Sequence, residues 1–195
     1  MNSTKKLRRM NGTALLMALV VVLQLLGGVI PPIGGFTISL VLIPIVLGTT
    51  IYGPKTGALL GATFSVIVII GCITGTDVGG AMVFQSNPIL CVIVVLAKGV
   101  LAGVLSGLVY NIVKERSSRL AMLLAAIICP VVNTGVFIAC MALFFQNVLA
   151  AWAGGSNIPG YILSGLILCN FVPELIINVI FSTASHRILQ MNYRK

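Results

Sequence analysis

Apolar stretches alternate with short polar or glycine-rich turns along the whole chain. Six stretches stand out, and they cover about residues 12–30, 36–51, 56–73, 98–111, 120–145 and 160–182. Because a membrane-spanning helix needs roughly 20 predominantly apolar residues, the pattern predicts an all-α membrane protein with about six transmembrane helices, the second of them short. Residues 89–96 are apolar and rich in β-branched side chains. They form either an extended segment along the outer surface or the first turns of a long helix.

Polar and glycine-rich segments mark the ends of the predicted spans. The run Pro31-Pro32-Ile33-Gly34-Gly35 is a strong helix breaker after the first span. Residues 74–87 and 146–159 are polar and predict two outer loops. The second of these loops holds the only tryptophan, Trp152, which we expect at the interface between lipid and water.

The composition excludes a soluble protein. The chain has 195 residues, of which 58% are hydrophobic and only 8% are charged, whereas about a quarter of the residues of a soluble domain are charged. Most of the outer surface must therefore face lipid. We expect one integral membrane domain over residues 1–195, with basic cytoplasmic tails at 1–11 and 187–195.

The net charge of +9 reports membrane topology rather than a nucleic-acid partner. Eleven of the twelve basic residues fall on the same side of a six-span arrangement: Lys5, Lys6, Arg8, Arg9, Lys55, Lys114, Arg116, Arg119, Arg187, Arg194 and Lys195. Cytoplasmic segments of membrane proteins carry such an excess of lysine and arginine. The asymmetry places both termini in the cytoplasm, and we expect a multi-pass protein of a prokaryotic-type plasma membrane.

Four polar residues within the spans are candidates for binding a solute, since polar groups are costly inside a bilayer. Lys98 falls near the outer end of the fourth span, Asn133 near the middle of the fifth, and Asn170 and Glu174 one helical turn apart on the sixth. We expect them to converge on a site in the outer half. Other interpretations stay open, because Lys98 can snorkel to the headgroups and the other three can form hydrogen bonds between helices.

The sequence disfavours an enzyme, a metal site and a bound cofactor. The five cysteines are scattered through apolar stretches with no CxxC, and there is one histidine, so clustered metal ligands are absent. The three carboxylates lie at different levels, which disfavours an acid–base pair. No phosphate-binding GxxxxGK[ST] loop is present, so any use of ATP must belong to a partner.

The first span carries a feature that suits contact with another helix. Ala14 and Ala18 are separated by one turn and therefore lie on the same helix face. Small residues at this spacing let helices approach closely, although the pattern is also common by chance in apolar helices.

The chain resembles the substrate-binding (S) components of energy-coupling factor (ECF) vitamin transporters over essentially its whole length. The matching features are the basic N-terminus, Ala14-xxx-Ala18, Ile43-Pro44, the turn Gly53-Pro54-Lys55-Thr56-Gly57-Ala58 with Gly61, and the run Ala97-Lys98-Gly99-Val100-Leu101-Ala102-Gly103 with Gly107 and Tyr110. Their order and spacing, together with the six-span size, carry the resemblance.

The resemblance implies a subunit that captures a scarce vitamin from outside and does not hydrolyse ATP. It implies docking on a transmembrane coupling subunit and two ATPases, with Ala14 and Ala18 meeting the coupling subunit, and toppling of the S component during transport. The stretch 130–137 looks most like the pantothenate-type branch, in which Lys98, Asn133, Asn170 and Glu174 would bind the vitamin. Folate, riboflavin, thiamine and pyridoxine remain alternatives, as does a stand-alone secondary carrier or channel.

Overall fold

The computed structural model describes residues 3–29, 40–155 and 157–193, and this part of the chain is almost wholly helical, without a β-strand. The elements in chain order are α1 (Ser3–Val29), α2 (Leu42–Tyr52), α3 (Pro54–Thr74), α4 (Val78–Ser86), α5 (Pro88–Val113), α6 (Ser118–Phe144), α7 (Gln146–Ala153), α8 (Ile158–Tyr161), the π-helix η1 (Ile162–Phe171) and α9 (Val172–Tyr193). The predicted all-α architecture is confirmed.

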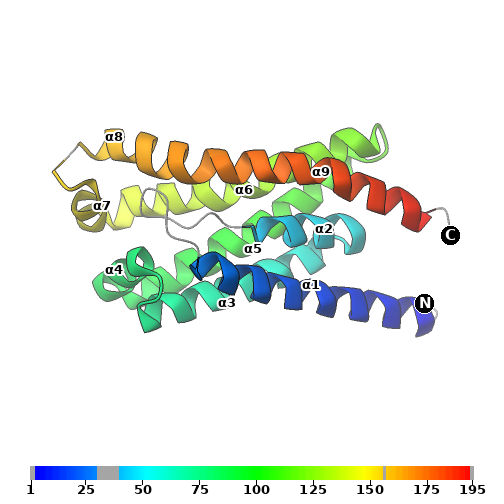
Figure 1. The fold of residues 1–195 in the computed structure, drawn as a ribbon, viewed down its shortest axis with the longest axis horizontal. Helices are drawn as coiled ribbons and strands as arrows, with labels where there is room; N and C mark the ends of the chain where they lie inside the picture. Colours follow the sequence, from blue (N-terminus) through cyan, green and yellow to red (C-terminus); the bar gives the residue numbers. More distant parts are fainter. Residues whose placement is uncertain (1–2, 30–39, 156, 194–195) are drawn as a thin grey trace.

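Five helical segments within the described residues are long and apolar enough to cross a membrane. They cover Lys6–Gly27, Pro54–Thr74, Pro88–Val113, Ser118–Phe144 and Ile158–Ser182, the last comprising α8, η1 and the first half of α9. These segments lie side by side as an elongated bundle, and both chain ends lie at the same end of it (Figure 1). The positive-inside rule assigns that end to the cytoplasm. Both predicted tails continue as helix, from Ser3 at one end and to Tyr193 at the other.

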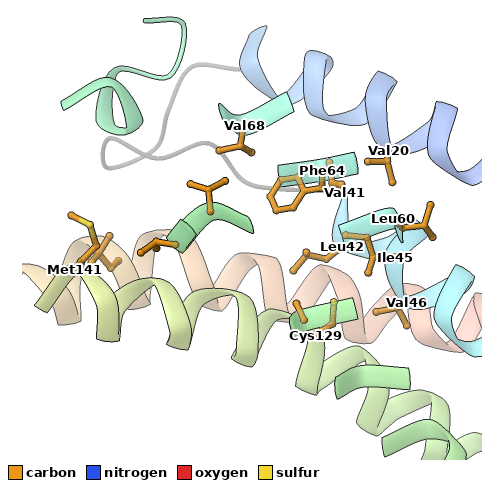
Figure 2. Packing of buried hydrophobic residues seen from close by; sticks show 14 of the residues in the cluster. Val20, Val41, Leu42, Ile45, Val46, Leu60, Phe64, Val68, Cys129 and Met141 are labelled. Atoms are coloured by element: carbon orange, nitrogen blue, oxygen red, sulfur yellow. The ribbon is translucent and has the colours of Figure 1, made fainter. Parts of the chain in front are cut away.

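The short helix α2 is the sixth apolar helix, and it lies inside the bundle. It packs against α1, α3, α5, α6 and α9, and Figure 2 shows Leu42 and Ile45 among the buried apolar side chains. Because α2 is enclosed by other helices, it does not have to span the lipid by itself, and 11 residues are enough. The expected start at residue 36 is too early, because residues 40–41 form a turn and residues 36–39 lie outside the described part, as does the breaker run 31–35.

Both expected outer loops contain a helix, which corrects the sequence interpretation. The helix α4 lies within residues 74–87, and Asp77 begins it by accepting a hydrogen bond from the amide of Gly80 at 2.9 Å. The helix α7 lies within residues 146–159. Residues 89–96 are the first turns of α5, since Asn87 caps that helix through the amide of Leu90 at 3.1 Å and Pro88 occupies its first turn. A proline there needs no amide hydrogen and favours the helical φ.

Glycines allow α3 and α5 to cross in backbone contact. A β-carbon added at Gly61 would meet the carbonyl of Gly99, and one added at Gly103 would meet the carbonyl of Gly57. Two hydroxyls reinforce this contact region: Ser65 donates to the carbonyl of Val95 at 2.7 Å, and Thr49 of α2 donates to that of Gly103 at 3.0 Å. Close approach of this kind is the main source of helix packing energy in lipid. It also fixes α5, and therefore Lys98, relative to α3.

The substitution Gly103→Ala should destabilise the bundle, because the added methyl group meets main-chain atoms that cannot rotate away. We expect a loss of at least about 1 kcal/mol, the scale of overpacking in a close-packed interior. The control is Gly135→Ala on α6, where a β-carbon meets nothing within 4 Å and alanine improves helix propensity. Thermal unfolding of the purified protein should show a lower midpoint for Gly103→Ala only. Equal midpoints for both variants would contradict backbone contact at this crossing.

Candidate substrate-binding site

Lys98 lies deep in α5 and points its ammonium group at aromatic rings. The helix begins at Pro88, so Lys98 lies about 15 Å along it from its outer end. Its Nζ is 4.9 Å from the ring centroid of Phe137 on α6 and 5.7 Å from that of Phe64 on α3. These distances are typical of cation–π contacts. Lys98 is thus not near the outer end of its span, as the sequence suggested, and it is oriented into the bundle instead of snorkelling outward.

A cluster of buried oxygen atoms lies on α6 and on the last span. Five side-chain oxygens have no hydrogen-bond partner within the described part: Oδ1 of Asn133, Oγ1 of Thr134, Oδ1 of Asn170, Oε2 of Glu174 and Oδ1 of Asn178. The side chain of Glu174 is only 2% exposed. Asn178 is the partial exception, since its amide group donates to the main-chain carbonyl of Glu174 at 2.9 Å. Buried polar atoms are normally paired, so five unpaired acceptors call for a missing donor.

Lys98 does not pair with the buried Glu174 carboxyl of this cluster. Within the described residues, no ion pair joins Lys98 to Glu174, so the lysine does not neutralise the carboxyl by direct contact. Lys98 on α5 and Glu174 on α9 are therefore separate polar groups inside the bundle.

The positions of the predicted site residues on α6, η1 and α9 show which of them lie on neighbouring helices. Asn133 and Thr134 lie four and three positions before Phe137, the ring under Lys98, and such residues share one helix face. The helix α6 packs against both η1 and α9, which carry Asn170 and Glu174. Lys98 therefore meets α6 at Phe137, three residues from Thr134, and Glu174 lies on α9, which packs against α6. The structure sets Asn133 and Asn170 on adjoining helices, each with a buried oxygen.

The last span is locally a π-helix where it carries Asn170. The segment η1 covers Ile162–Phe171, and the amide of Val172 donates to the carbonyl of Ile167, five residues earlier. Pro173 follows immediately and has no amide hydrogen to donate to the preceding turn. A wider turn before the proline accommodates this loss, and π-helical segments are frequent at functional sites.

Aromatic and sulfur contacts connect the site to the two outer helices. Trp152 of α7 stacks on Phe137, with ring centroids 6.4 Å apart and planes at 27°. Its indole Nε1 donates to Sδ of Met82 on α4 at 3.3 Å. The tryptophan therefore packs on Phe137 and Met82, and its place at the interface between lipid and water stays a prediction. Sequence reasoning also missed Phe64, Phe137 and Thr134, although Phe137 could have been found by its spacing from Asn133.

The two candidate docking residues lie on the opposite half of the molecule. Ala14 and Ala18 are both exposed on α1, which packs against α2 and α3 through an inner face, and Ala14 lies at the edge of that face toward α3. Val20 on that inner face is fully buried (Figure 2). The alanine face of α1 is therefore accessible to another helix in the membrane.

Comparison with known proteins identifies the family. The family model of the ECF transporter substrate-specific component matches residues 8–184. The chain belongs to this family. It is also similar to the pantothenic acid transporter PanT of Lactococcus lactis subsp. cremoris (strain MG1363), with 28% identity over an alignment of 184 positions. The match covers 88% of this chain and 88% of that protein. No solved structure matches it significantly.

Membership settles the broad role of this S component. It is a multi-pass cell-membrane protein and the substrate-binding subunit of a vitamin-uptake system, not an enzyme. Among the described residues, no three histidine, cysteine or carboxylate groups gather as metal ligands would.

Proposed function

We propose that this S component captures pantothenate from outside the cell. The observation that carries the proposal is the division of the site into one cation and a set of unpaired acceptors. Lys98 stands on one side, and the free oxygens of Asn133, Thr134, Asn170 and Glu174 stand on α6 and the last span. A ligand that suits this site has an anionic end and several hydrogen-bond donors at its other end.

Pantothenate has this distribution of groups. Its single carboxylate can pair with the single positive charge of a lysine ammonium, which is a point charge and not a planar fork. Its two hydroxyls and its amide N–H are donors that can satisfy the orphaned acceptors. Its methyl groups can contact aromatic rings such as Phe64 and Phe137, which lie beside Lys98. Similarity to a pantothenic acid transporter supports the same assignment.

The chain's own part in transport is binding and delivery. We propose that Ala14 and Ala18 dock on a membrane-embedded coupling subunit, and that partner ATPases hydrolyse the ATP that drives release inside. This S component itself binds no cofactor in the proposal. The exposed alanine face on α1 supports the docking role, since small residues permit close helix contact.

The decisive test is equilibrium binding by the purified full-length chain. Native mass spectrometry should find pantothenate at one molecule per chain, and calorimetry should show that it binds at least about tenfold more tightly, or about 1.4 kcal/mol, than riboflavin, thiamine, pyridoxine or folate. The stacked pair Phe137 and Trp152 makes these aromatic vitamins the relevant competitors. Preference for any of them would overturn the pantothenate assignment.

A second measurement separates an S component from a stand-alone carrier. Liposomes that contain only this chain should bind pantothenate without transporting it into the lumen, because the energy source lies in the partner subunits. Uptake into such liposomes at a rate that depends on protein would favour the carrier alternative. The same liposomes with the coupling subunit, ATPases and ATP provide the positive control.

A further inference from the structure

A groove lies between α1 and α3 at the cytoplasmic end of the bundle, far from the candidate substrate site. It has a volume of about 560 Å³. Nine residues line it: Lys6, Arg9, Met10, Thr13, Ala14 and Met17 from α1, and Lys55, Thr56 and Leu59 from α3. Nothing in vitamin capture explains the three cations in this set.

The positive charge of the groove is uncompensated. The chain has only three carboxylates, Asp77, Glu115 and Glu174, and none of them lines the groove. Lys6, Arg9 and Lys55 are exposed, and within the described residues neither lysine forms an ion pair. Arg9 is positioned by a hydrogen bond from its Nη2 to Oγ1 of Thr56 at 3.4 Å. In the described part of the chain, three cations from two helices therefore face one space with no carboxylate in its lining.

Polarity changes along the groove in the direction of the membrane normal. Lys6 and Arg9 lie near the start of α1, and Met17 lies about 12 Å deeper than Arg9 along the helix. On α3, Lys55 lies at the helix start and Leu59 one turn deeper. The groove is therefore cationic where headgroups lie and apolar where acyl chains lie. A soluble anion would use only the first half of this surface, whereas an amphiphile would use both.

We infer that this groove binds an anionic phospholipid of the cytoplasmic leaflet, with the phosphate at Lys6, Arg9 and Lys55 and an acyl chain along Met17 and Leu59. Charge complementarity and the polarity gradient both select this occupant. Basic pockets between membrane helices on the cytoplasmic side are suited to anionic headgroups, since each nearby lysine or arginine adds attraction. The inference concerns α1 and α3 alone and does not depend on which vitamin is bound.

The test compares two triple variants of the full-length chain that lose the same charge at the same membrane face. Lys6→Gln/Arg9→Gln/Lys55→Gln removes the cations of the groove. Lys114→Gln/Arg116→Gln/Arg119→Gln removes three exposed cations at the turn between α5 and α6. Native mass spectrometry would measure binding of phosphatidylglycerol and phosphatidylcholine to each protein after delipidation. Thermal unfolding and size-exclusion chromatography would verify that both variants are folded.

Phosphatidylglycerol should bind the groove variant at least about tenfold more weakly than the wild type, on the scale of about three lost surface attractions, and should bind the control variant nearly normally. Phosphatidylcholine should bind all three proteins weakly.

Equal losses of phosphatidylglycerol binding in both variants would mean general attraction to a basic membrane face and would overturn the site. Binding of the water-soluble headgroup, glycerophosphoglycerol, as tightly as the whole lipid would also overturn it, because the apolar half would then contribute nothing. A misfolded groove variant would be replaced by the single change Lys55→Gln, which should show the same selective loss to a smaller degree.

Discussion

Replacing Lys98 with alanine should weaken pantothenate binding by about 1–3 kcal/mol, the scale of a hydrogen bond to a charged group. The ammonium lies inside the bundle beside Phe64 and Phe137, so water replaces it poorly when it is removed. Calorimetric titration of purified Lys98→Ala with pantothenate gives the measurement.

The contact between Lys98 and the pantothenate carboxylate can also be tested by changing the ligand. Pantothenol replaces the carboxylate with a hydroxymethyl group, so it should bind Lys98→Ala and the wild type with similar affinity. The non-additivity of the two changes isolates the interaction between the ammonium and the carboxylate. Lys114→Ala, at the cytoplasmic end of α5, is the matched control and should bind pantothenate normally. An unchanged affinity of Lys98→Ala for pantothenate would remove Lys98 from the site.

The periodic elements of the fold were predictable, and the capped short helices were not. Long apolar runs determine α1, α3, α5, α6 and the last span, because only helices satisfy their own backbone in lipid. The helix α4 was missed because its second and third residues are Gly79 and Gly80, which disfavour a helix. Its formation depends on the cap by Asp77 and on packing against α3 and α5. Tertiary contacts of that kind are not visible in local composition.

The candidate site was predictable in its polar half only. Lys98, Asn133, Asn170 and Glu174 were recognisable because polar groups are conspicuous in apolar runs. Phe64 and Phe137 were not recognisable, since a phenylalanine in a membrane helix faces lipid as readily as a ligand. Which rings lie beside Lys98 depends on how α3 and α6 pack against α5. Backbone contacts at glycines set the crossing of α3 and α5. The side chains of His186 and the following residues lie outside the described part.

Ala14→Trp should abolish assembly with the coupling subunit while leaving pantothenate affinity unchanged. Ala14 is exposed on α1, so an indole there projects into the space that a partner helix needs for close contact. The substrate site is unaffected because α1 contributes none of its residues. Co-purification of the tagged variant with co-expressed coupling subunit and ATPases, followed by calorimetry on the free variant, measures both effects.

Two further variants decide what such a result means. Ala18→Trp lies one turn deeper on the same face and does not line the basic groove, so its failure to assemble would assign the effect to helix docking rather than to a displaced lipid. Ala139→Trp places the same indole on an exposed position of α6, a helix that α1 does not contact, and it should assemble normally. If Ala14→Trp and Ala18→Trp both assemble like the wild type, the alanine face is not the docking surface. If Ala139→Trp also fails, the loss reflects bulk in the membrane and not a specific contact. Only selective loss at the two alanines supports α1 as the helix by which this S component meets its partner.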